Sequence, residues 1–148
     1  MLACLNETLR QYPPVPISLP RVVPKGGHEI AGHWVPEDTV VGVWQQAANY
    51  SETNFTKPEE FHPERFLGDE AFYKDDLAAM QPFSVGPRNC IGRNLAYAEM
   101  RLILARILYK FDLELAPEAR DWIKIQKVYT LWDKPKLPVY LKPIKTSA

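Results

Sequence analysis

The stretch FSVGPRNCIG, residues 83–92, decides how the rest of this 148-residue chain is interpreted. Its cysteine, Cys90, stands directly before the strongest helical pattern in the chain. A cysteine at the N-terminus of a helix lies near the positive end of the helix dipole, which favours the thiolate. Arg88 adds positive charge, and Gly86 and Gly92 have no Cβ, so the backbone can approach a flat and bulky group. These residues predict a thiolate metal ligand on a loop that lies against a large cofactor.

Three other interpretations of Cys90 remain open at this stage. A single cysteine is most often buried and chemically inert. A disulfide with Cys4 is compatible with the spacing, although two separated cysteines are few for a disulfide-built scaffold. A zinc site would need further Cys or His ligands at close spacing, and His28, His33 and His62 share no such pattern with the cysteine.

The same stretch resembles the haem-binding signature of the cytochrome P450 monooxygenases, Phe-x-x-Gly-x-Arg-x-Cys-x-Gly, at all five fixed positions. The resemblance implies haem b as cofactor and Cys90 as the axial ligand of its iron. It also implies that an arginine after the first proline-rich stretch pairs with a haem propionate; the alternative for this residue is a solvated loop arginine. The cofactor-binding residues implied are Cys90, Phe83, Gly86, Arg88, Gly92 and Arg21.

Two further motifs resemble the same family in the same order. Glu7-x-x-Arg10 is similar to its Glu-x-x-Arg helix signature, and Pro63-Glu64-Arg65-Phe66 is similar to its Pro-Glu-Arg-Phe motif. Helical periodicity alone favours an exposed Glu7–Arg10 pair, because it places both residues opposite the leucines. The resemblance instead implies that Glu7, Arg10 and Arg65 form a buried structural triad, which is not catalytic.

The fourteen prolines restrict where helices can form, because proline removes a backbone donor and clashes with the preceding turn. Helices are expected over residues 1–12 and 92–111, the second with a wide apolar stripe and therefore buried. The fold class expected is mainly α with small β-sheets, the C-terminal part of the cytochrome P450 fold, as one partial domain over residues 1–148. The smaller elements expected are short helices at 47–50 and 69–73, a small sheet from strands 28–31 and 39–44, and a terminal β-hairpin pairing 127–132 with 137–141.

Composition excludes several classes of function. Eighteen basic and eighteen acidic residues give no net charge and no footprint for nucleic acid. The richest apolar window, residues 102–108, is interrupted by Arg106 and is too short for a membrane span, so the chain as given is expected to be soluble. The chain starts inside a helical pattern and contains no counterpart of the family's distal oxygen-activating helix, which leads us to expect a truncated chain.

The family resemblance implies a function for the parent protein. It predicts a fungal or other eukaryotic microsomal monooxygenase, at the endoplasmic reticulum membrane, that uses O₂ and electrons from an NADPH-dependent flavoprotein reductase to hydroxylate an apolar small molecule. Arg88, Arg93 and Arg101 suggest a docking face for that reductase; the alternative is solvated helix charges. Residues 15–19, and Thr130 with Leu131, resemble stretches that touch substrate, although ordinary loop positions would look the same.

Two alternative functions remain open from the sequence. One is a truncated haem-binding or interaction module with no activity of its own. The other is a family member that isomerises or dehydrates peroxides without external electrons, which these residues do not distinguish from an oxygenase.

Overall fold

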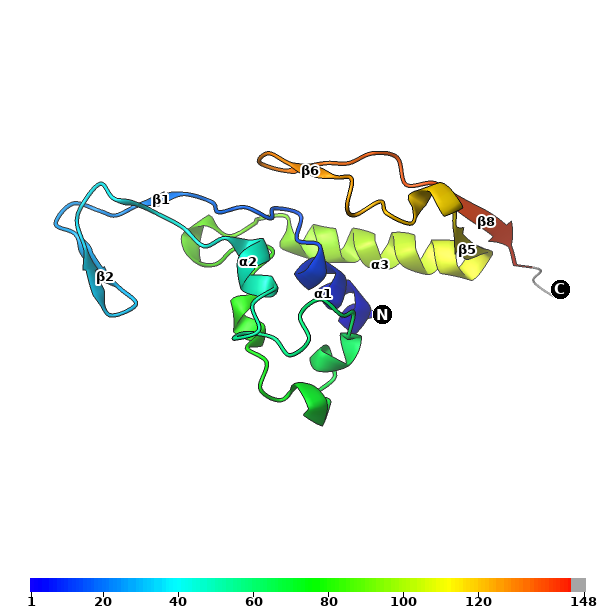
Figure 1. Ribbon diagram of the computed structural model, residues 1–148, viewed down its shortest axis with the longest axis horizontal. Helices are drawn as coiled ribbons and strands as arrows, with labels where there is room; N and C mark the ends of the chain where they lie inside the picture. Colours follow the sequence, from blue (N-terminus) through cyan, green and yellow to red (C-terminus); the bar gives the residue numbers. More distant parts are fainter. Residues whose placement is uncertain (145–148) are drawn as a thin grey trace.

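The computed structural model describes residues 1–144 and consists of helices joined by long extended segments and two-stranded sheets. Figure 1 shows α3 as the long axis of the molecule, with α1 and α2 on one side of it and a β-hairpin extending away at one end. The α-helices are α1 (Leu2–Gln11), α2 (Gln45–Asn49) and α3 (Arg93–Lys110). The helices predicted at 1–12 and 92–111 are therefore confirmed.

The buried core surrounds α1. Leu5 and Leu9 are buried on one side of this helix, and Glu7 and Arg10 are fully buried on another. Both sides are covered because α1 packs against α2 and against the short 3-10 helix η1 (Pro63–Phe66). The exposed pair that periodicity alone favours is therefore not present, since a surface helix pattern does not apply to a helix enclosed on two sides.

Residues 45–82 wrap around α1 in short helical turns. After α2 come the 3-10 helices η1, η2 (Glu70–Phe72) and η3 (Leu77–Ala79). Asp69 and Asp76 begin two of these turns, and their carboxylates accept hydrogen bonds from the backbone N–H groups of Ala71 and Ala78. Such side-chain caps explain how a stretch without apolar periodicity still adopts a defined path. The helices expected at 47–50 and 69–73 are shifted by two residues or fewer.

The sheet expected from strands 28–31 and 39–44 is wrong in its pairing. β2 (His28–Ile30) pairs with β3 (His33–Val35) as a tight antiparallel hairpin. The later strand, β4 (Val40–Val41), pairs instead with β1 (Arg21–Val22). Ala31 and Gly32 both have positive φ, which lets the chain reverse after β2 and brings β3 beside it.

The predicted terminal hairpin between 127–132 and 137–141 is also wrong. β6 (Lys127–Val128) pairs with β7 (Trp132–Asp133), so the chain reverses at residues 129–131. β8 (Val139–Pro143) pairs over its whole length with β5 (Phe111–Leu115), the strand that follows α3. The remaining 3-10 helices are η4 (Gly86–Arg88), which precedes α3, and η5 (Pro117–Ala119), which lies between β5 and β6 in the chain.

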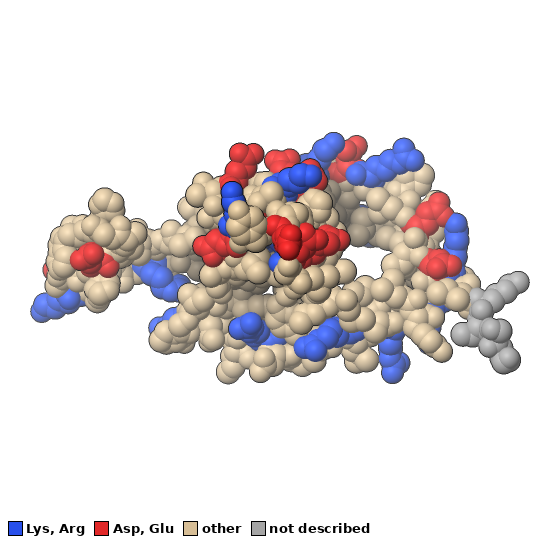
Figure 2. All heavy atoms as spheres, turned by 90° about the horizontal axis from the view of Figure 1, so that it is seen from below, with Lys and Arg blue, Asp and Glu red and all other residues tan. Residues whose placement is uncertain are grey.

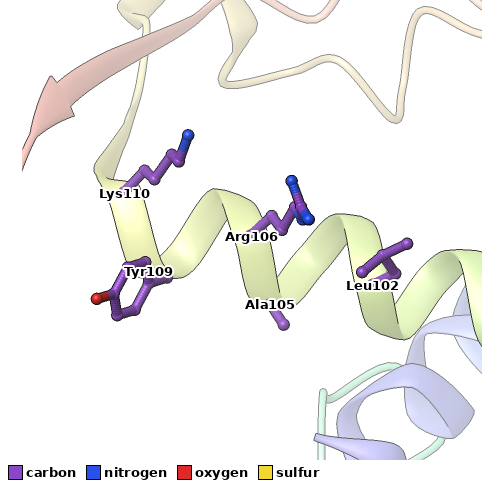
Figure 3. Close-up of a pocket in the computed structure, with 5 residues that line it drawn as sticks. All are labelled: Leu102, Ala105, Arg106, Tyr109 and Lys110. Carbon is purple, nitrogen blue, oxygen red and sulfur yellow. The ribbon is translucent and has the colours of Figure 1, made fainter.

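The expectation that α3 is buried is wrong for the described residues. None of its side chains is buried, and Leu95, Leu102 and Ile103 are each more than half exposed. Its apolar residues are spread around the helix instead of forming one stripe, and no element within residues 1–144 buries them. An open hollow lies along the C-terminal half of the helix, where Figure 3 shows Arg106 and Lys110 projecting from one side and Ala105 and Tyr109 from another.

Candidate functional site

The loop of residues 83–92, the cysteine loop, is closed by its own backbone. The N–H of Cys90 donates to the carbonyl of Phe83 over 2.8 Å, and the N–H of Asn89 donates to the carbonyl of Gly86 over 3.0 Å. Gly86 has a φ of +74°, a conformation that glycine adopts without strain. The closed loop holds Cys90, exposed and free, two residues before Gly92, the N-cap of α3.

The surface beside Cys90 suits a large flat group. A Cβ added to Gly86 would meet nothing within 4 Å, and one added to Gly92 would meet only Cys90 Sγ at 3.7 Å. Gly92 therefore leaves space beside the sulfur that a side chain would narrow, and the backbone at Gly86 is open. A thiolate is a soft ligand that iron in haem accepts, so the donor atom and the uncovered backbone around it fit a haem group.

Phe83 connects the cysteine loop to two helices. Its half-buried ring packs against the ring of Tyr97 of α3, with a centroid separation of 5.4 Å. The hydroxyl of Tyr97 donates to Asn6 Oδ1 of α1 over 2.9 Å. The loop that carries the cysteine is thus fixed to the residue next to Glu7. The sequence pattern gave no indication of Tyr97 or Asn6.

The structure brings Glu7 and Arg10 of α1 together with Arg65 of η1. Arg10 Nε and Nη2 each donate to a different oxygen of the Glu7 carboxylate over 2.8 Å, which is a bidentate ion pair. Arg65 Nε lies 3.0 Å from Glu7 Oε2, although its N–H is not aligned for a hydrogen bond. The N–H of His62 donates to Glu7 Oε1 over 3.0 Å, so both carboxylate oxygens have several partners.

Sequence reasoning missed a fourth charged member of this group, Asp75. Its carboxylate pairs with Arg65 Nη1 and accepts the N–H of Thr56 over 2.7 Å, and its side chain is almost fully buried. We call Glu7, Arg10, Arg65 and Asp75 the buried charge cluster. Two carboxylates and two guanidinium groups make the cluster neutral in total, which lowers the cost of burying it.

Aromatic and amide side chains complete the surroundings of the cluster. The guanidinium of Arg65 lies 4.6 Å from the ring centroid of Phe72, and that of Arg10 lies 5.2 Å from that of Phe55. Asn49, which is fully buried, donates to the carbonyl of Arg10 over 2.7 Å, while Arg10 Nη1 donates back to the carbonyl of Asn49 over 2.8 Å. No sequence motif marked Asn49, because its partner lies far away along the chain.

Arg21 and Arg88, the arginines expected to face the propionates, are both exposed. Arg21 begins β1 and donates to the carbonyl of Pro20 over 2.9 Å, and Arg88 ends η4 within the cysteine loop. Neither forms an ion pair within residues 1–144. Both guanidinium groups are therefore free to bind an anionic group.

Charge is distributed unevenly over the chain despite its net neutrality. Acidic residues outnumber basic ones between positions 51 and 76, whereas the only acidic residue of α3 is Glu99. Figure 2 shows acidic side chains gathered near the middle of one face and basic ones spaced along its lower border. Arg93, the first residue of α3, and Arg101, in the middle of that helix, are both exposed.

The segments expected to touch substrate lie in two separate connections of the chain. Residues 13–20, the proline-rich passage, lead from α1 to β1, and Thr130 and Leu131 lie in the turn between β6 and β7. Leu131 is exposed, as is Tyr129 beside it. Within the described residues, no helix combines the length and apolar character needed to cross a bilayer.

The structure thus has an exposed thiol on a closed loop at the start of a long helix, and a buried ion-pair cluster on α1. The sequence profile of the family described as Cytochrome P450 matches residues 1–141. The chain belongs to the cytochrome P450 family.

Several curated proteins and solved structures are similar to this chain. A cytochrome P450 monooxygenase of Talaromyces stipitatus is 59% identical over 148 residues, which is 100% of this chain and 29% of that protein. An averantin hydroxylase of Dothistroma septosporum is 58% identical over 146 residues, 97% of this chain and 28% of that protein. A structure of a zebra fish cytochrome P450 with abiraterone matches with a TM-score of 0.76 and 29% identity, covering 97% of this chain and 32% of that one.

These comparisons establish the fold as part of the cytochrome P450 fold, with few helices and small sheets. They also agree with the prediction of a fungal relationship, because the two curated relatives come from fungi. The chain spans about three-tenths of the length of the curated relatives that it matches.

Proposed function

We propose that this chain is the haem-binding part of a monooxygenase in which Cys90 would provide the thiolate ligand of the haem iron. The observation that carries the proposal is the geometry of the cysteine loop: an exposed sulfur at the N-terminal end of α3, with an uncovered glycine backbone on either side. Bound haem b supplies the redox and oxygen chemistry, and a thiolate ligand favours O–O cleavage.

The chain's own residues have distinct tasks in this proposal. Cys90, two residues before the N-cap of α3, holds the iron through its sulfur. Arg88 and Arg21 bind the two carboxylates of the cofactor through their free guanidinium groups. Phe83 holds the loop in position through Tyr97 of α3. The buried charge cluster fixes α1 beneath the loop and takes no part in proton transfer.

The remaining parts of the function follow from the family and from the surface. Residues 15–19 and the turn with Thr130 and Leu131 contact an apolar organic substrate. Exposed Arg88, Arg93 and Arg101 form the docking face for an acidic, NADPH-dependent flavoprotein reductase, because they are basic and none of them forms an ion pair within the described residues. We assign the complete protein to the endoplasmic reticulum membrane. The names of the relatives, monooxygenases and hydroxylases, do not favour a non-catalytic module.

The experiment that tests the proposal is the reduced carbon-monoxide difference spectrum of the complete protein. We expect a thiolate-type Soret band in the wild type and its loss in Cys90→Ser. The matched control is Cys4→Ser, because Cys4 is the other exposed free cysteine and lies in α1. A thiolate-type band that persists in Cys90→Ser, or disappears equally in Cys4→Ser, would contradict the assignment.

A further inference from the structure

The proline-rich passage, residues 13–20, has few means of holding its position. Prolines have no backbone N–H, and extended proline-rich chain forms no internal hydrogen bonds. The passage must therefore be anchored mainly through its carbonyl groups. The carbonyl of Pro16 accepts the N–H of Gln46 over 3.0 Å, and Ser18 forms an isolated bridge with Trp44. Both contacts lie on the side of α2 and leave the start of the passage to another anchor.

That anchor is Trp132, the first residue of β7. Its indole Nε1–H donates to the carbonyl of Pro13 over 2.7 Å, across 119 positions of the chain. Pro13 itself is fully buried. Among residues 1–144 this is the only hydrogen bond that a side chain elsewhere in the chain makes to residues 13–19.

Two more aromatic rings hold Trp132 in place. Tyr12, the C-cap of α1, stacks on Trp132 with a centroid separation of 4.7 Å and an interplanar angle of 21°. Trp122 also packs against Tyr12, with a centroid separation of 5.8 Å and an interplanar angle of 43°, and its indole N–H donates to the carbonyl of Pro135 over 2.9 Å. We call Tyr12, Trp122 and Trp132 the aromatic clamp.

Polar groups fix the clamp further. The hydroxyl of Tyr12 donates to Gln126 Oε1, and the amide of Gln126 donates to the carbonyl of Trp122 over 3.3 Å. The ammonium of Lys134 lies 5.2 Å from the centroid of the Tyr12 ring. All of these contacts are made inside the described chain. They join the end of α1 to the hairpin of β6 and β7. We call the turn of this hairpin, residues 129–131, the hairpin tip. Figure 1 shows the hairpin on the same side of α3 as the proline-rich passage.

We propose that the aromatic clamp, with Trp132 as its positioning residue, holds the hairpin tip against the proline-rich passage and thereby sets the shape of the substrate pocket. The inference rests on the proposed function, in which these two segments contact an apolar substrate. The side chain of Trp132 connects the two segments. Trp132 is the first residue after the hairpin tip, and its indole N–H donates to the carbonyl of Pro13. Trp132 touches neither the iron ligand nor the cysteine loop, so it acts through the two segments that it joins.

The test uses the complete protein, loaded with haem, and two probes that differ by one phenyl ring: imidazole and 4-phenylimidazole. Both ligate iron, so the small probe reports on the iron site and the large one also on the surrounding wall. Trp132→Phe keeps an aromatic ring for stacking and removes the N–H to Pro13. We expect it to weaken 4-phenylimidazole binding by about fivefold, the effect of one ordinary hydrogen bond, with imidazole binding unchanged.

A second readout does not depend on haem. Amide hydrogen exchange in Trp132→Phe is expected to accelerate together in peptides covering residues 15–19 and 129–131, and to stay unchanged in residues 28–35. The matched control is Trp34→Phe, because Trp34 is exposed on β3 and its indole N–H has no partner in the described chain. Equal changes for both probes, no change for either, or faster exchange at the hairpin tip alone would overturn the proposal.

A second variant keeps the outcome decisive. Tyr12→Phe preserves the stacking and removes only the hydroxyl bound to Gln126, so it tests the clamp if Trp132→Phe fails to fold. An unchanged ratio of the two probe affinities in Tyr12→Phe, with unchanged exchange in both segments, then rejects the clamp. Absence of a thiolate-type spectrum in the wild type would reject the proposed function instead, and the exchange measurement would still decide about the clamp.

Discussion

Replacing Asp75 with asparagine removes one negative charge from the buried charge cluster and little else. The side chain keeps its shape. The N–H of Thr56 donates to Asp75 Oδ1 over 2.7 Å in the structure, and the amide oxygen of asparagine can accept the same hydrogen bond. What is lost is the ion pair with Arg65 Nη1. The cluster changes from neutral to a net charge of one positive, in a site where both arginine side chains have no solvent exposure.

The expected cost follows from that uncompensated charge. Removing one partner of a buried ion pair destabilises a protein by about 3–5 kcal/mol. The lower end applies here, because Arg65 keeps Glu7 at 3.0 Å and the ring of Phe72 at 4.6 Å. We therefore expect Asp75→Asn to lower the free energy of unfolding by about 3 kcal/mol. That is a large share of the roughly 5–15 kcal/mol that keeps a domain folded.

The measurement is equilibrium urea unfolding of the complete protein, followed by far-UV circular dichroism. The neighbouring Asp76→Asn is a matched control: Asp76 is exposed, and its carboxylate accepts the N–H of Ala78, which an amide oxygen can also accept. Its unfolding free energy should change by less than about 0.5 kcal/mol. If Asp75→Asn and Asp76→Asn are equally stable, the argument from buried net charge is refuted.

A double-mutant cycle adds a sharper condition. Arg65→Gln combined with Asp75→Asn removes one charge of each sign and leaves the Glu7–Arg10 pair, which is neutral by itself. The double variant should therefore be less destabilised than the sum of the two single variants, by about 1–3 kcal/mol. Additive effects would show that the two side chains do not interact as the structure indicates.

Burial raises the pKa of Tyr50 above its ordinary value of 10.0, so the folded state holds that proton more tightly than the unfolded one. Its stabilising contribution is complete below pH 10 and is lost as pH rises through the folded pKa. In urea unfolding, Tyr50→Phe should therefore reduce the fall in the free energy of unfolding above pH 10. Parallel plots of unfolding free energy against pH for the two proteins would contradict this. Asn49→Ala leaves the carbonyl of Arg10 without its donor at a fully buried site, which should lower the free energy of unfolding by about 1–3 kcal/mol. Thermal unfolding tests this against the exposed Asn94→Ala, and equal midpoints would argue against a structural role for the amide.

Features encoded in a short continuous segment were predictable from the sequence. The cysteine loop lies within ten consecutive residues, so its glycines, arginine and cysteine are close together without any contact to a distant segment. The two long helices were predictable for the same reason, because apolar spacing and the absence of internal proline act locally. Pro13 ends the first helix, as its effect on the preceding residue requires.

Pairings between distant segments were not predictable in this way. The apolar pattern of residues 137–141 predicts a strand but does not specify its partner. This strand pairs with β5 and not with residues 127–132, which are nearer in the sequence. The turn expected around Pro135 is instead part of an extended connection, since the chain already reverses at residues 129–131. Asp75 illustrates the same limit at the site: its charge looks like any surface carboxylate until Arg65 is brought to it by the turns of η1 and η2.

α1 connects the three parts of the molecule on which function depends. Glu7 and Arg10 join it to the buried charge cluster, Asn6 joins it through Tyr97 and Phe83 to the cysteine loop, and Tyr12 joins it to the aromatic clamp. Side chains at neighbouring positions of one helix point in different directions, so a ten-residue helix can reach all three. A shift of α1 would therefore move Cys90, the proposed iron ligand, and the expected substrate segments together. The buried ion pair therefore has a structural consequence: it fixes the helix to which the cysteine loop and the aromatic clamp are attached.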